Sequence, residues 1–154
     1  DDTERHGIEK HAVLFEEFLV NEHVAGRLDL DWQAIPQTEA LVHGHCHQKA
    51  FGVMGSVTTA LNWIPGLQVS TVDSSCCGMA GAFGYQASTY DVSMQMGELD
   101  LLPAVRASKP DTLVVADGTS CRHQIEHGAA RTALHVAQVL ERALPPTTSE
   151  STHH

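Results

Sequence analysis

The chain has 154 residues, of which 42% are hydrophobic and 18% are charged, and this composition is typical of one globular domain of ordinary size. Its formal net charge of −10 argues against nucleic acid as a partner, because phosphates are bound by clustered basic side chains. No apolar run approaches the roughly 20 residues that span a bilayer, and residues 1–4 lack the basic start of a secretory signal. We therefore expect a cytoplasmic protein, with a peripheral position at the inner face of the membrane as a second option.

The predicted elements alternate longer helices with short apolar strands. Residues 1–37 are expected to form an N-terminal helix, with an irregular apolar stripe at 8–20, and a connector. After residue 38, aliphatic and β-branched runs predict strands, and segments that stop before proline predict helices. The predicted strands are 40–43, 67–72, 112–116 and 132–136, and the predicted helices are 51–63, 80–98, 101–108, 120–127 and 136–144. Residues 147–154 are expected to be a disordered tail in which His153 and His154 are the remnant of a tag.

This alternation predicts an α/β fold with an open, mainly parallel four-stranded sheet and helices on both faces, similar to a Rossmann fold. The clearest strand is 112–116, Thr-Leu-Val-Val-Ala, because a continuous apolar run is typical of a strand that is covered on both faces.

The chain has four cysteines, and each follows a predicted strand. Cys46 follows the first, the adjacent pair Cys76 and Cys77 follows the second, and Cys121 follows the third. A bridge between two neighbouring cysteines would be strained, so we expect ligand or redox use rather than structural disulfides. Because ligands of open parallel sheets bind at the carboxyl ends of the strands, we expect all four thiols to meet at that edge.

Glycines follow the double cysteine at every third position, namely Gly78, Gly81 and Gly84. We interpret them as a face without side chains that lets a bulky cofactor approach the backbone and lets N–H groups donate to sulfur. The alternative is that small residues here only allow two helices to pack closely. Four thiolates suit an iron–sulfur cluster or zinc, and neighbouring cysteines can bind different irons of a cluster more easily than one zinc ion.

Four short motifs of the sequence resemble a known family. They are His45-Cys46-His47, Cys76-Cys77-Gly78-Met79-Ala80-Gly81, Thr119-Ser120-Cys121-Arg122-His123-Gln124 and Ile64-Pro65-Gly66. Together they resemble the cysteine-rich CCG domain over about residues 38–144. That domain occurs in the heterodisulfide reductase B subunit and in the iron–sulfur subunit of glycolate oxidase. It also forms the C-terminal part of fused FAD-linked oxidases of the D-lactate and D-2-hydroxyglutarate dehydrogenase type, which the third motif resembles most.

The resemblance implies that residues 38–146 are a CCG domain in which Cys46, Cys76, Cys77 and Cys121 ligate an iron–sulfur cluster, with 4Fe-4S as the expected type. It also implies FAD-binding and ferredoxin-like domains elsewhere in a longer parent protein. Electrons from a flavin that oxidises a 2-hydroxy acid would then pass through this domain to a quinone or a cytochrome, and the fragment alone would not be catalytic. The family pattern ends in Cys-x-x-Cys, whereas Gly118 and Gln124 stand at the flanking positions here, which favours a single cubane-type cluster or a cluster that needs a second module.

Several polar residues near the cysteines have two interpretations, one functional and one structural. His43, His45 and His47 alternate, so an extended segment would project them on one face. We expect His45 and His47, ahead of His43, to assist the cofactor as ligands or proton acceptors; the alternative is that one caps the next helix.

Arg122 and His123 either balance the charge of a cluster or bind a carboxylate, or they lie on an ordinary solvated helix face. Two other functions also stay open at this point. One is a structural zinc module that docks partners, and the other is an enzyme with Cys77 or Cys121 as nucleophile.

Overall fold

The computed structural model describes residues 12–74 and 76–146. The predictions for the tail and the tag, and for the first part of the N-terminal helix, lie outside these residues. The elements are, in chain order, α2 (Phe15–Val24), β1 (Glu39–His43), α3 (Cys46–Ala50), α4 (Met54–Leu61), β2 (Gln68–Thr71), the 3₁₀ helix η1 (Phe83–Tyr85), α5 (Tyr90–Gly97), α6 (Leu101–Ala107), β3 (Leu113–Ala116), α7 (Thr119–Ala129), β4 (Ala133–Leu134) and α8 (Val136–Arg142).

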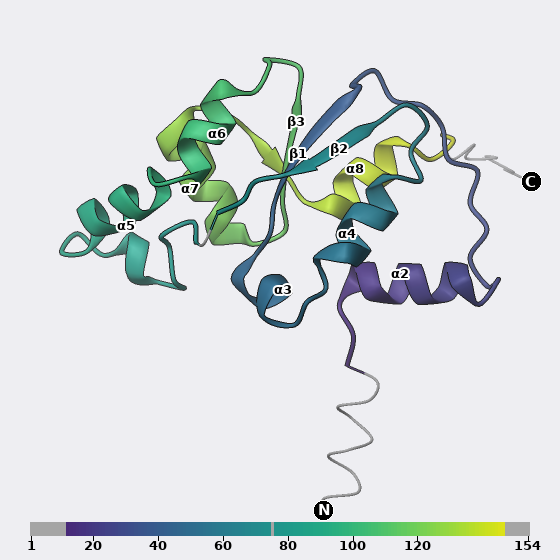
Figure 1. Cartoon of the computed structure of the whole chain (residues 1–154), viewed down its shortest axis with the longest axis horizontal. Coiled ribbons are helices and arrows are strands. Elements are labelled where there is room, and N and C mark those ends of the chain that lie inside the picture. Colours follow the sequence, from purple (N-terminus) through teal and green to yellow (C-terminus); the bar gives the residue numbers. More distant parts are fainter. Residues whose placement is uncertain (1–11, 75, 147–154) are drawn as a thin grey trace, which may run out of the picture.

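The four strands form one parallel sheet in the order β2-β1-β3-β4, so the predicted α/β fold is confirmed. In the register of the sheet, Ala40 of β1 lies opposite Val69 of β2 and Leu113 of β3. The next strand in the chain after β1, which is β2, lies on one side of β1, whereas β3 and β4 lie on its other side (Figure 1). The strand order therefore reverses between β1 and β3, and ligands of open α/β sheets bind at such a point.

Helices cover both faces of the sheet, and the alternation of side chains along each strand builds two apolar clusters. Ala40 and Val42 of β1 pack with α4 and α8, whereas Leu41 packs on the opposite face with residues of α6 and α7. Helix α2 lies against α4 on the outer side of the first cluster (Figure 1). His43, the last residue of β1, points to the same face of the sheet as Leu41 and is only 1% exposed. A polar ring therefore enters the second face at the end of a central strand.

Prolines end several of the helices, as the sequence predicts. Pro65 follows α4, Pro110 follows α6, and Pro145 follows α8. Pro103 lies in the first turn of α6, where the missing N–H would have no helical acceptor. The predicted strand 132–136 is shorter in the structure, because His135 leaves it to cap α8 with its ring, which accepts from the N–H of Ala137.

The predicted helix over 80–98 is wrong in its first half. Gly78, Ala80 and Gly81 have positive φ angles of 90°, 40° and 67°, which no α-helix contains. Residues 80–82 therefore form a turn that leads into the short η1, and regular helix begins only at Tyr90. The glycines make a turn after the double cysteine rather than the start of a helix.

Within the described residues, no helix combines the length and the apolar composition that a membrane crossing requires.

We expect the Leu61→Ala variant to lower the free energy of unfolding by about 2–5 kcal/mol, because it opens a cavity where the side chain is 0% exposed between sheet and helices. Leu99→Ala removes the same atoms from a side chain that is 70% exposed and should change that free energy by less than about 0.5 kcal/mol. Urea unfolding of both variants measures the difference; equal values would contradict the placement of the core.

Candidate metal centre

The structure brings the four cysteines to the carboxyl edge of the sheet from three separate segments. Cys46 is the first residue of α3, Cys76 and Cys77 lie in the loop after β2, and Cys121 lies in the first turn of α7. The sulfur atoms form two close pairs: Cys46 and Cys76 are 3.9 Å apart, and Cys77 and Cys121 are 3.2 Å apart. None of the four forms a disulfide bond. The expected meeting of the thiols at this edge is what the structure shows.

The two pairs differ in their access to solvent. Cys77 and Cys121 are 2% and 1% exposed, whereas Cys46 lies at the surface and Cys76 is half-buried. Because Cys76 and Cys77 are adjacent, the peptide between them joins the inner pair to the outer pair. The site is therefore closed on its protein side and open on the side of Cys46.

Hydrogen bonding divides the inner pair into a thiolate and a thiol. The Cys121 S–H, together with the neighbouring His43 ring and the N–H of Met79, lowers the pKa of Cys77 to about 4. The same hydrogen bond to Cys77 and the burial of the side chain raise the pKa of Cys121. The negative charges of Cys77, Cys46 and Cys76 raise it further, so the four sulfur atoms act on one another as one electrostatic unit.

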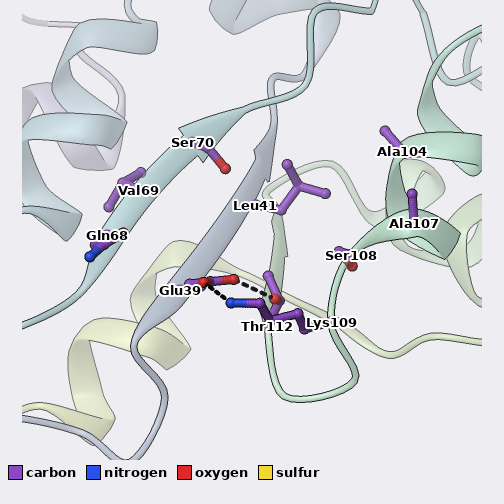
Figure 2. A pocket seen from close by; sticks show the side chains of 10 residues that line it. All are labelled: Glu39, Leu41, Gln68, Val69, Ser70, Ala104, Ala107, Ser108, Lys109 and Thr112. Carbon is purple, nitrogen blue, oxygen red and sulfur yellow. Dashed lines mark hydrogen bonds and ion pairs between the residues drawn. The ribbon is translucent and has the colours of Figure 1, made fainter.

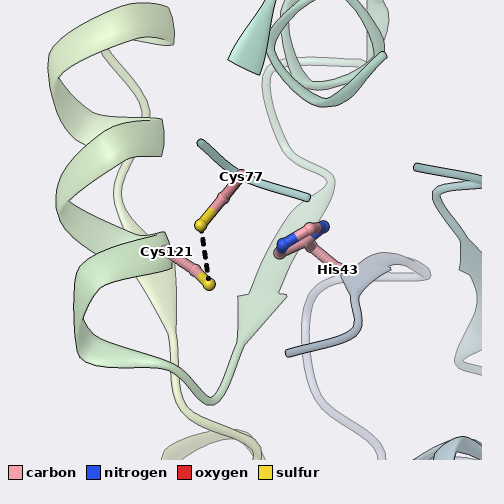
Figure 3. A group of neighbouring side chains, drawn as sticks. All are labelled: His43, Cys77 and Cys121. Carbon is pink, nitrogen blue, oxygen red and sulfur yellow. Dashed lines mark hydrogen bonds between the residues drawn. The ribbon is translucent and has the colours of Figure 1, made fainter. Parts of the chain in front are cut away.

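His43 points into the inner pair, as Figure 3 shows. One of its ring nitrogens and the sulfur atoms of Cys77 and Cys121 all lie within 4.8 Å of one another. Nδ1 of His43 lies 3.0 Å from Oγ of Ser74, while Nε2 is buried with no hydrogen-bond partner among the described residues. A buried imidazole nitrogen without a partner is costly, and it suits a position beside a metal or a sulfur acceptor.

The three alternating histidines do not share a face, because the strand ends at His43 and a helix begins at Cys46. His45 instead caps α3, with Nδ1 accepting from the N–H of His47, as in the alternative reading. Burial lowers the pKa of His45, and the charge of His47 lowers it further. His43 is thus the histidine that enters the cysteine site, although the sequence ranks it below the other two. The sequence feature that could have identified His43 is its position at the end of a buried central strand.

The glycines after the double cysteine have two roles. The N–H of Gly78 donates to Sγ of Cys76 at 3.2 Å, which is the predicted type of contact. A Cβ atom on Gly78 would lie 2.1 Å from the carbonyl oxygen of Ser93, and one on Gly84 would lie 2.5 Å from Oγ of the same serine. Gly78 and Gly84 therefore let the loop pack closely against α5, which favours the packing alternative at these two positions. A Cβ on Gly81 would meet nothing within 4 Å, and a cofactor contact at Gly81 stays a prediction.

The residues after Cys121 serve mainly to hold elements together. Nη1 of Arg122 donates to the carbonyl oxygens of Ala116 and Asp117, so the guanidinium group is bound to the turn between β3 and α7. Gln124 donates to the carbonyl oxygen of Ser93 at 3.0 Å and joins α7 to α5. His123 lies farther out, with Nδ1 2.6 Å from Oη of Tyr85.

Sequence reasoning missed Lys49 as a charge partner of the site. Its Nζ donates to the carbonyl oxygen of Ser74, which is the residue that also contacts the His43 ring. Burial raises the pKa of Cys46, followed by the nearby Cys76, and the positive charge of Lys49 opposes that rise. The sequence feature that could have identified Lys49 is its position three residues after Cys46, because residues with this spacing are neighbours on a helix.

A cavity of about 480 Å³ lies at the other end of the sheet, between β1, β2 and α6 (Figure 2). Glu39 at the start of β1 pairs there with Lys109 and accepts from Thr112 at 3.3 Å. No cysteine lines this cavity, so it is separate from the cysteine site.

Comparisons with known proteins find that the sequence of this chain is similar to parts of two oxidoreductases. Over 106 residues, or 69% of this chain, the sequence is 33% identical to the C subunit of the anaerobic glycerol-3-phosphate dehydrogenase of Escherichia coli K12, with the same values for the protein of strain O157:H7. Over 137 residues, or 82% of this chain, it is 28% identical to D-2-hydroxyglutarate dehydrogenase of Escherichia coli K12.

The chain spans 26% of the length of the first relatives and 12% of the length of the second. No family model matches the chain, and no solved structure matches it. The chain is therefore similar to one part of each of two dehydrogenases, and it is related to a domain of redox enzymes.

Proposed function

We propose that this chain is the iron–sulfur electron-transfer domain of a flavin-linked dehydrogenase. The observation that carries the proposal is the gathering of four cysteine sulfurs from three segments at one sheet edge, in a chain similar to parts of two dehydrogenases. Cys46, Cys76, Cys77 and Cys121 would hold the cluster, and a 4Fe-4S type suits four thiolate ligands. When bound, the cluster supplies a centre that accepts and releases single electrons.

The donor chemistry of the site fits such a group. Thiolates are soft ligands that select iron–sulfur clusters or zinc, and the pKa of Cys77 at about 4 keeps that side chain ionised at neutral pH. The N–H of Gly78 already donates to a sulfur, and Lys49 supplies a positive charge near Cys46. Hydrogen bonds and charges of this kind tune the potential of a cluster, and burial of Cys77 and Cys121 excludes water from its inner side.

The open side of the site suits exchange of electrons with another domain. Cys46 is exposed, and Phe51 at the end of the same short helix is 75% exposed. In the longer parent protein, we propose that FAD-binding and ferredoxin-like domains face this side, and that the electrons come from a 2-hydroxy acid. The reaction partner at the far end would be a quinone or a cytochrome.

One observation favours a structural zinc site as the second candidate. Two thiolates on one tetrahedral zinc ion are about 3.8 Å apart, since each Zn–S bond is about 2.3 Å long. The two sulfur pairs, at 3.9 and 3.2 Å, are near that value, and His43 gives the inner pair a third ligand. Zinc has no redox chemistry, however, so it would not carry electrons through the domain.

We expect the Cys76→Ser and Cys121→Ser variants to lose most of their iron, acid-labile sulfide and visible absorption after anaerobic reconstitution, because a serine hydroxyl is a poor ligand for iron in a cluster. Ser120→Ala, a substitution beside Cys121, should keep the wild-type content. Metal analysis, sulfide analysis and circular dichroism check the outcome. Full iron and sulfide in either cysteine variant would refute the ligand assignment.

The His43→Gln variant separates the two candidates. If four thiolates hold a cluster, the variant keeps its iron and sulfide, because no ligand is lost and the amide of glutamine still offers N–H donors to the sulfurs. If the ion is zinc held by His43, Cys77 and Cys121, the zinc content of the variant falls instead. His127→Gln, at an exposed position of α7, is the matched control for both measurements.

A further inference from the structure

A second group of metal-ligating side chains lies at the same edge of the sheet and contains no cysteine. It consists of Glu16, Asp117 and His135, and one ligand atom from each lies within 4.8 Å of the other two. Asp117 follows β3, His135 follows β4, and Glu16 lies in the first turn of α2. The fold therefore brings together three segments that are far apart in the sequence.

Glu16 is the residue that needs an explanation. It is only 3% exposed, and the hydrogen bond that acts on its carboxylate comes from its own backbone N–H. Burial raises the pKa of Glu16 and the charge of Asp117 raises it further, although the backbone N–H of Glu16 and the nearby His135 oppose the rise. Glu16 and Asp117 carry like charges when both are ionised, and a cation bound between them would stabilise both carboxylates.

The other two residues are held in place by their surroundings. Asp117 accepts from Nε2 of Gln48 at 2.5 Å through one oxygen and from the N–H of Val136 at 2.9 Å through the other. A carboxylate has about four acceptor positions, so lone pairs remain for an ion. Nδ1 of His135 is 3.6 Å from Oδ1 of Asp117, and an ion bound there would compete with the N–H of Ala137 for that nitrogen.

The three side chains line one cavity of about 280 Å³, with His45 and Gly118 on its wall towards the cysteines. This volume holds an ion and several waters, since each water occupies about 30 Å³ of the liquid. Two carboxylates and an imidazole are hard and borderline donors, which suit Mn²⁺, Fe²⁺ and Zn²⁺ and differ from the soft thiolates on the other side of His45.

We infer that Glu16, Asp117 and His135 bind one divalent transition-metal ion, separate from the group held by the cysteines. This inference does not depend on the proposed iron–sulfur function. The competing explanation is that Asp117 only joins the starts of α3 and α8, and that Glu16 is a buried acid beside it.

Mn²⁺ is the probe that separates this site from the cysteines, because carboxylates bind it well and thiolates select softer ions. Binding of Mn²⁺ to the full chain at neutral pH is measured by the loss of the six-line electron paramagnetic resonance signal of the free ion. We expect one saturable site whose affinity falls at least tenfold in the Glu16→Gln variant, which keeps the shape of the side chain and removes its charge.

His135→Asn is the second variant, because asparagine still caps a helix while the imidazole is lost, and its affinity should fall as well. Glu22→Gln is the matched control, since it removes a carboxylate of the same helix that pairs with Arg27 at the surface. Cys121→Ser should also bind Mn²⁺ as the wild type does. The inference is overturned if no saturable binding occurs below millimolar Mn²⁺, if Glu16→Gln binds like the wild type, or if binding is lost in Cys121→Ser.

Discussion

The carboxyl ends of four parallel strands lie at one edge of the sheet, and the chemistry of this protein depends on that constraint. A parallel strand must be followed by a connection that starts at this edge, so the residues after β1, β2, β3 and β4 all meet there. Cys46, Cys77, Cys121 and His135 come from those four connections. The strand order reverses between β1 and β3, which leaves room between their ends for polar groups and for an ion or a cluster.

The edge is divided into a sulfur side and a carboxylate side. Cys77 and Cys121 lie on the face that α6 and α7 cover, whereas Glu16 and His135 lie towards α2 and α8. Between them stands His45, which fits because position 118 is glycine: a Cβ atom there would lie 2.4 Å from Cδ2 of the ring. The glycine at position 118 thus admits the His45 ring between the cysteines and the carboxylates, and burial lowers the pKa of that ring.

Most of the fold could be predicted from the sequence because each strand carries its own local signal. The run 112–116 is apolar throughout since both faces of β3 are covered, and prolines mark the ends of α4, α6 and α8. The segment after Cys77 could not be predicted in the same way. Its glycines are compatible with a helix of small residues or with a left-handed turn, and the close approach of Ser93 in α5 decides for the turn.

The sequence alone determined that four thiols follow three successive strands, and this order suffices to bring them to one edge in any parallel sheet. Only the tertiary structure decided which polar groups join them. His43 enters the sulfur site because the pleat of β1 turns it inward, and His45 turns away because a helix begins at Cys46. Glu16 reaches Asp117 only because α2 packs on α4, and no spacing in the sequence encodes a contact between residues so far apart.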